Sequence, residues 1–234
     1  MKVSQIQLRQ VIDSRMAEIK DKTSTNQFDI ETEDTSIRDV VDFLDTHLQN
    51  FPADFIKRTS KPTEIKENLI SQELEVFLNR RSSDSLFRFK GQWQYDDSQR
   101  EPDFGVYVVE DRNPFGLTRE IFVIEAKILP TGKKDYVVGD IGGIQRFKKG
   151  HHGKGLPESA MVGYVQKENC SHWHNKINEW IKELIQTNTE VDIIWNEDDL
   201  LTHLSDFNKV KKYISENKRE KDSIMLYHYL MDLK

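Results

Sequence analysis

The sequence predicts an α/β fold in which helices flank a central mixed β-sheet. Short apolar runs rich in Val, Ile and Phe are typical of buried strands, and the segments around them carry apolar residues at helical spacing. The 234 residues, 36% hydrophobic and 32% charged, suffice for one sizeable core beneath a charged surface. We expect an N-terminal helical region over residues 1–60 and one larger domain over residues 61–234.

Two helices are expected in the N-terminal region, over residues 3–20 and 36–48, with a polar, Thr-rich connector over residues 22–35 between them. Acidic residues are concentrated from Asp29 to Asp45. DNA contact is therefore the least favoured role for this region, whereas capping the core or mediating association stays open.

A third helix is expected to begin at Pro62-Thr63-Glu64. Its apolar residues recur at helical spacing, at Leu69, Ile70, Leu74, Phe77 and Leu78. Glu67 falls on that apolar face and is the first choice for a buried acidic residue. Glu73 is the second choice, and Glu64 and Glu75 are expected to face solvent.

Most remaining elements are expected to be strands. The first four are expected over Gln92–Arg100, Phe104–Val109, Ile121–Leu129 and Ala160–Val165. A helix follows around Trp173–Gln186, and then two further strands over Val191–Trp195 and Ser223–Leu230.

Charged residues interrupt two of these apolar runs. Arg100-Glu101-Pro102-Asp103-Phe104-Gly105 opens one run, and Ile124-Glu125-Ala126-Lys127 lies inside the next, with Glu125 22 positions after Asp103. Because side chains alternate along a strand, Glu125 and Lys127 share one face. A carboxylate and an ammonium are therefore expected on one half-buried surface.

The connection Asn113-Pro114-Phe115-Gly116 suits a tight turn and predicts an antiparallel hairpin. A hairpin symmetric about Pro114 and Phe115 would pair Asp103 with Ala126 and leave Asp103 on the face opposite Glu125. A shared site therefore requires a one-residue bulge or an odd-length turn.

These residue types suit a magnesium site. Asp103 and Glu125 offer hard oxygen ligands, and the backbone carbonyl of Ala126 is a plausible third. Mg²⁺ can activate a bound water as a nucleophile and polarise a phosphoryl oxygen. Lys127 would either orient or deprotonate that water or neutralise charge on the phosphorus, and both roles stay open.

Pro102-Asp103 followed by Glu125-Ala126-Lys127 resembles the PD-(D/E)xK nuclease superfamily, which has the restriction-endonuclease-like fold, over roughly residues 62–170. The resemblance implies an acidic residue on the preceding helix, where Glu67 would contact a metal or its waters. It implies a Mg²⁺-dependent endonuclease acting on DNA, in a bacterial or phage-related setting such as restriction or another defence system. Mn²⁺ is expected to substitute for Mg²⁺.

The resemblance also implies a Gln and basic residues on a helix after the Glu-x-Lys strand, which the segment Gly142–Lys149 matches. Gln145 can bind a water or a phosphate, and Arg146 can donate two N–H groups to a phosphate. Basic residues expected to contact the DNA backbone are Arg146, Lys148, Lys149 and Lys154, with His151 and His152 between them. A solvated loop is the alternative.

The segment Cys170-Ser171-His172-Trp173-His174 carries groups that suit zinc, but the single cysteine and the helical apolar stripe from Trp173 favour a packed helix. One cysteine allows no intramolecular disulfide and suits a reducing cytoplasm. No apolar run approaches the length of a membrane span. We expect a cytoplasmic protein that does not enter a membrane.

The net charge of −6 suggests limited non-specific affinity for DNA, and hence a partner protein that helps to deliver the substrate. A homodimer also stays open, because double-strand cutters often need two sites. Two alternatives compete with a DNA endonuclease. One is a catalytically inactive nucleic-acid-binding or assembly module of the same fold, and the other is a metal-dependent enzyme acting on RNA or a small nucleotide.

Overall fold

A computed structural model describes residues 30–91, 102–109, 117–129, 134–139, 143–187 and 193–234. Three predicted elements lie outside the described residues: the helix over residues 3–20, the strand Gln92–Arg100 and the turn Asn113–Gly116. Among the described residues, no helix is both long enough and apolar enough to cross a membrane.

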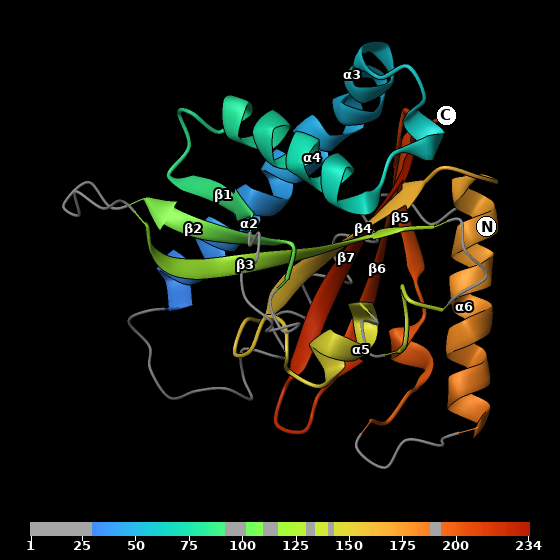
Figure 1. Cartoon of the computed structure of the whole chain (residues 1–234). Helices are drawn as coiled ribbons and strands as arrows, with labels where there is room; N and C mark the ends of the chain where they lie inside the picture. Colours follow the sequence, from blue (N-terminus) through green and yellow to red (C-terminus); the bar gives the residue numbers. More distant parts are fainter. Residues whose placement is uncertain (1–29, 92–101, 110–116, 130–133, 140–142, 188–192) are drawn as a thin grey trace.

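Seven strands form one mixed sheet in the order β1-β2-β3-β4-β7-β6-β5 (Figure 1). The pairs β3–β4 and β4–β7 are parallel, and the other neighbours are antiparallel. The strands are β1 Phe87–Gly91, β2 Phe104–Val109, β3 Leu117–Ile128, β4 Glu158–Val165, β5 Thr202–Phe207, β6 Val210–Lys218 and β7 Ser223–Asp232. The predicted α/β class with a central mixed sheet is confirmed.

Helices cover both faces of this sheet (Figure 1). The described helices are α2 Ile30–His47, α3 Phe51–Arg58, α4 Glu67–Arg81, α5 Gly143–Lys148 and α6 Cys170–Thr187, with short 3₁₀ helices η1 Leu48–Asn50, η2 Pro62–Glu64 and η3 Glu197–Asp199. Apolar residues of α2, α3 and α4 form one core with the sheet, and those of α5 and α6 form a second core on the opposite face. Each apolar face of the sheet is thus removed from water.

The alternation of β3 decides which face receives the charged side chains. Phe122, Ile124 and Ala126 belong to the core beneath α2 to α4, whereas Val123 belongs to the core beneath α5 and α6. Glu125 and Lys127 therefore lie on the second face. They are buried, with 2% and 8% of their surface exposed, rather than half-buried as the sequence predicts. The difference arises because α5 and the loop after it cover this part of β3.

The helix predicted from Pro62 begins later, at Glu67. Pro62–Glu64 forms the separate helix η2, and Ile65 and Lys66 are extended. The Gln166 amide donates to the Pro62 and Ile65 carbonyls and so holds the extended segment against the end of β4. Leu69 is 46% exposed, so its predicted place on the apolar face of the helix is wrong.

Three further expectations are corrected. Residues 30–35 of the predicted connector are helical, because α2 begins at Ile30. The described part of the strand predicted at Val191–Trp195, residues 193–195, forms no strand. Glu75 is half-buried rather than solvent-facing, because its carboxylate accepts a hydrogen bond from the Gly91 amide of β1.

Candidate active site

The β2–β3 hairpin has the register that a shared site requires. Phe104 pairs with Ile124 and Val106 with Phe122, and then two register shifts follow toward the turn. The regular stretch places Asp103, one residue before β2, in line with Glu125, so the two carboxylates share a face. The last pair, Val109 and Leu117, is separated by an odd number of intervening positions, and this spacing supplies the offset that a hairpin symmetric about Pro114 and Phe115 lacks. The two one-residue shifts together leave the face unchanged.

Asp103 is fixed to the neighbouring strand by its own carboxylate. Its Oδ2 accepts a hydrogen bond of 2.7 Å from the backbone N–H of Ala126. Asp103 is half-buried, and Pro102 before it is buried. The Asp103 carboxylate is therefore held at the boundary between the core and solvent, beside the backbone of the Glu-x-Lys motif.

Glu125 and Lys127 form a close ion pair on the same face of β3. The Lys127 ammonium lies 2.7 Å from Oε1 of Glu125, and the Glu125 side chain is only 2% exposed. Glu125 and Lys127 are two positions apart on one strand, so their side chains point the same way and meet without distortion.

Glu67 reaches this pair from the first residue of α4. Its Oε2 accepts a 2.7 Å hydrogen bond from the Ile128 amide, and its Oε1 lies 3.5 Å from the Lys127 ammonium. The helix is fixed here by a 3.1 Å hydrogen bond between the hydroxyls of Ser71 and Tyr164. Glu73, the second choice from the sequence, instead pairs with Arg58 at 2.7 Å on the surface.

Burial and neighbouring charges shift the pKa values of Asp103, Glu67 and Lys127. Burial, and next the charge of Glu125, raise the pKa of Asp103 to about 7. Burial likewise raises the pKa of Glu67, opposed by the Lys127 ammonium. Burial alone would lower the pKa of Lys127, but Glu125, Asp103 and Glu67 outweigh it and raise that pKa. Lys127 is therefore held in its charged form, while Asp103 keeps a proton more readily than an ordinary aspartate.

Helix α5 brings Arg146 to the cluster and uses Gln145 for its own anchoring. The Arg146 guanidinium lies 3.9 Å from Oε1 of Glu125. Gln145 is buried, and its side-chain carbonyl accepts a 2.8 Å hydrogen bond from the Gly139 amide in the turn that precedes the helix. Arg146 thus lies beside the carboxylates, and Gln145 ties the start of α5 to the preceding turn.

The predicted basic stretch divides into a buried lysine and exposed ones. Lys148 is fully buried, and its ammonium lies 2.5 Å from Asp199 of η3 and 5.0 Å from the centre of the Trp195 ring. Because Lys148 is buried and paired with Asp199, its ammonium is not available to contact DNA. Lys149 and Lys154 are exposed and stay candidates for phosphate contact.

His152 joins the cluster, although its sequence context gave only a weak signal. Its ring is buried, with Nε2 3.4 Å from Oε2 of Glu125 and 3.2 Å from the Arg146 guanidinium. The sequence feature that points to His152 is its position in a Gly-rich loop just after the helix that carries Gln145 and Arg146. That signal does not distinguish it from the adjacent His151, which is exposed.

The donor set fits a hard divalent cation held by few protein ligands. Among the described residues, no group of three or more His, Cys, Asp or Glu side chains forms a ready metal-binding set. Mg²⁺ commonly binds through one or two carboxylates and retains several waters. Asp103 and Glu125, with the carbonyl of Ala126, would supply such a set, and Glu67 is placed to contact the waters.

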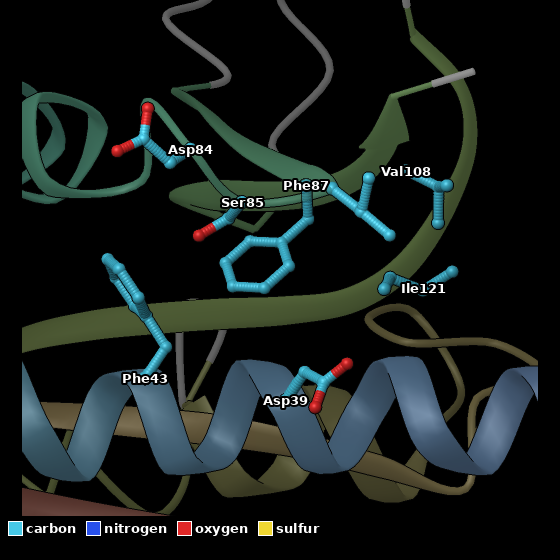
Figure 2. Close-up of a pocket in the computed structure, with 8 residues that line it drawn as sticks. Asp39, Phe43, Asp84, Ser85, Phe87, Val108 and Ile121 are labelled. Atoms are coloured by element: carbon cyan, nitrogen blue, oxygen red, sulfur yellow. The ribbon is translucent and has the colours of Figure 1, made fainter. Parts of the chain in front are cut away.

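A separate hollow of about 300 Å³ lies on the opposite face of the sheet, between α2 and the β1–β3 strands (Figure 2). Its walls include the apolar side chains of Phe43, Phe87 and Ile121, and its two charged residues, Asp39 and Asp84, are acidic. It shares no residue with the carboxylate cluster. Its acidic and apolar walls do not suit a phosphate.

No protein-family model, curated protein or solved structure matches the chain. The functional argument therefore rests on the site itself.

Proposed function

We propose that this chain is a Mg²⁺-dependent endonuclease that hydrolyses DNA phosphodiester bonds, with a core of the PD-(D/E)xK, restriction-endonuclease-like type. A DNA substrate and a defence setting belong to the proposal through that resemblance, and a partner protein belongs to it through the net charge of −6. Mn²⁺ is proposed to replace Mg²⁺.

One observation carries the proposal: the register of the hairpin puts Asp103 on the face of Glu125 and Lys127. Asp103 lies 22 positions before Glu125 in the sequence. A hairpin symmetric about Pro114 and Phe115 would place its side chain on the opposite face of the sheet from Glu125 and Lys127. The placement of the Asp103 carboxylate beside a buried ion pair of opposite charges supports a functional site.

Each residue of the cluster has a role that its contacts support. Asp103 and Glu125 would hold Mg²⁺, which supplies an activated water and polarises a phosphoryl oxygen. Because the carboxylates keep Lys127 as an ammonium, its contacts support stabilising negative charge on the phosphate rather than removing a proton from water. Glu67 holds Lys127 and the end of β3 in place.

The positive groups near the cluster support contact with phosphate. Arg146 lies at the rim of the carboxylate pair, with 11% of its side chain exposed, and can turn toward a phosphate that approaches. Lys149 and Lys154 are exposed on the α5 side and suit contact with the DNA backbone. Lys148 is left out of this set because of its buried pairing with Asp199.

The test is cleavage of supercoiled and linear DNA by the purified chain in Mg²⁺, Mn²⁺ or EDTA, beside Asp103→Asn and Lys127→Ala. We expect metal-dependent cutting by the wild type that falls by at least about 100-fold in each variant, since one lost electrostatic stabiliser commonly costs that much. Glu67→Gln is expected to reduce the rate too.

Glu73→Gln is the matched control for Glu67, because Glu73 lies on the same helix but pairs with Arg58 on the surface. It is expected to cut at the wild-type rate. Cutting that persists in EDTA, or in folded Asp103→Asn protein, would contradict the proposal. Cutting confined to RNA in a parallel assay would replace DNA as the substrate.

A further inference from the structure

His152 lies directly against two residues of the proposed active site. Its side chain is fully buried, and its Nε2 lies 3.4 Å from Oε2 of Glu125 and 3.2 Å from a guanidinium nitrogen of Arg146. Phe147 meets the ring edge-on, with 5.5 Å between ring centres. Because no part of the side chain is exposed, His152 is not placed to bind a DNA phosphate.

The loop after α5 has a backbone that forces this ring inward. The amides of His151 and His152 both donate to the Arg146 carbonyl, which closes the end of the helix. Gly150 and Gly153 have φ angles of +66° and +56°, which favour glycine. A Cβ on Gly153 would approach Ser159 Oγ to 2.9 Å, so only glycine lets the loop lie this close to β4.

We propose that His152 is a positioning residue that fixes the carboxylate of Glu125 for metal binding. Lys127 holds Oε1 of Glu125 at 2.7 Å, and His152 faces Oε2 from the other side. The two contacts together fix the plane of the carboxylate. The same Nε2 lies 3.2 Å from the Arg146 guanidinium, but a nitrogen that donates its N–H to Glu125 has no lone pair to accept from Arg146, so the role assigned to His152 is the Glu125 contact alone.

This inference rests on the proposed function, because Glu125 needs positioning only if it holds a metal. Partners that orient a metal-binding carboxylate commonly change metal affinity by about 10–100-fold when removed. A residue that served packing alone would change stability but would leave the affinity of the folded protein for metal unchanged. Metal affinity therefore separates the two roles.

The experiment is calorimetric titration of Mn²⁺ into the wild type, His152→Met, His152→Asn and His152→Gln, with single-turnover DNA cleavage measured beside it. Met fills a similar volume without a polar nitrogen, and the Asn amide is too short to reach Glu125. Both are expected to bind Mn²⁺ about 10–100-fold more weakly than the wild type. The Gln amide reaches the position of Nε2 and is expected to restore most of the affinity.

His172→Gln, an exposed histidine on α6, is the control and is expected to bind Mn²⁺ as the wild type does. Wild-type affinity in the folded Met or Asn variant would overturn the inference while leaving the proposed function intact. Equal weakening in the Met, Asn and Gln variants would also overturn it, because volume rather than the polar contact would then matter. A wild type that binds no Mn²⁺ and cuts no DNA would contradict both proposals.

Discussion

At the scale of single residues, the cluster around Glu125 contains more carboxylates than side-chain cations of Lys and Arg. Asp103, Glu125 and Glu67 contribute three carboxylates, which lie near the permanent cations Lys127 and Arg146. Burial first, and then the charge of Glu125, raises the pKa of Asp103 to about 7. A structural ion-pair network would be expected to balance its charges, whereas a site for a divalent cation would not.

The raised pKa of Asp103 predicts how the metal-free protein responds to pH. The folded state holds the Asp103 proton up to about pH 7, whereas the unfolded chain loses it near the ordinary value of 3.8. Asp103 therefore favours folding at low pH, and its contribution is lost as pH rises through about 7. Urea unfolding in EDTA should show less stability at pH 8 than at pH 5.

Asp103→Asn should reduce that difference, because an amide stays neutral at both values of pH and can still accept the hydrogen bond of the Ala126 amide. Saturating Mg²⁺ should also reduce it in the wild type, since the cation stabilises the ionised carboxylate. An Asp103→Asn variant with the pH dependence of the wild type would show that Asp103 is not the group responsible.

At the scale of elements, helix α5 is held at both ends. Its first amides, from Gly143 to Gln145, donate to carbonyls of the preceding turn, and Lys148 at its end is tied to Asp199 of η3. The Asp199 carboxylate in turn accepts a 2.7 Å hydrogen bond from the backbone N–H of Asn196. A helix of six residues has little stability of its own, so these ties fix the position of Arg146.

Removing one partner of the Lys148–Asp199 pair is therefore expected to be costly. Lys148→Met leaves the Asp199 carboxylate buried without its cation, which should cost about 3–5 kcal/mol of unfolding free energy. Lys148→Met combined with Asp199→Asn should recover most of that loss, because no uncompensated charge remains and Asn can still accept from Asn196. Urea denaturation of the wild type, both single variants and the double variant measures the recovery.

An exposed pair provides the comparison. Lys134 and Glu183 pair on the surface, and Lys134→Met is expected to change the unfolding free energy by less than about 1 kcal/mol. Equal costs for Lys148→Met and Lys134→Met would contradict the account of α5, as would a double variant no more stable than Lys148→Met.

The elements also differ in how far the sequence alone predicts them. Strands β2, β3, β4 and β7 are buried and have long apolar runs, so their predicted positions are confirmed. Strands β5 and β6 are rich in polar and charged residues, and the sequence did not predict them. Their strand structure depends on the pairing of β6 with β7 and of β5 with β6, and on contacts such as the 2.7 Å ion pair between Lys212 of β6 and Asp45 of α2.

At the scale of the whole molecule, the site joins segments that are distant in the chain. Glu67 contacts a strand that begins 50 residues later, and Lys148 is paired across 51 positions with Asp199. The motif of Asp103, Glu125 and Lys127 was predictable because it lies within one hairpin. His152 and the true partner of Lys148 were not, because their places depend on how α5 and its loop fold back over the sheet.

The proposed phosphodiesterase site is compatible with the acidic net charge of the chain. The net charge is −6, yet Arg146 of α5 lies 3.9 Å from Glu125, and Lys149 and Lys154, which follow α5 in the chain, are exposed. The pocket with Asp39 and Asp84 lies on the other face, beneath α2. Local charge rather than net charge would then decide where DNA binds.

The central claim is that β2 and β3 together form a divalent-cation site. Its most direct test is calorimetric titration of Mg²⁺ and Mn²⁺ into the wild type and Asp103→Asn at pH 7.5, in two buffers with different enthalpies of ionisation. The account predicts saturable binding by the wild type with release of protons, because Asp103 must ionise to bind the cation, and much weaker binding by Asp103→Asn. Absence of binding to the folded wild type, or equal affinity in the variant, would contradict it.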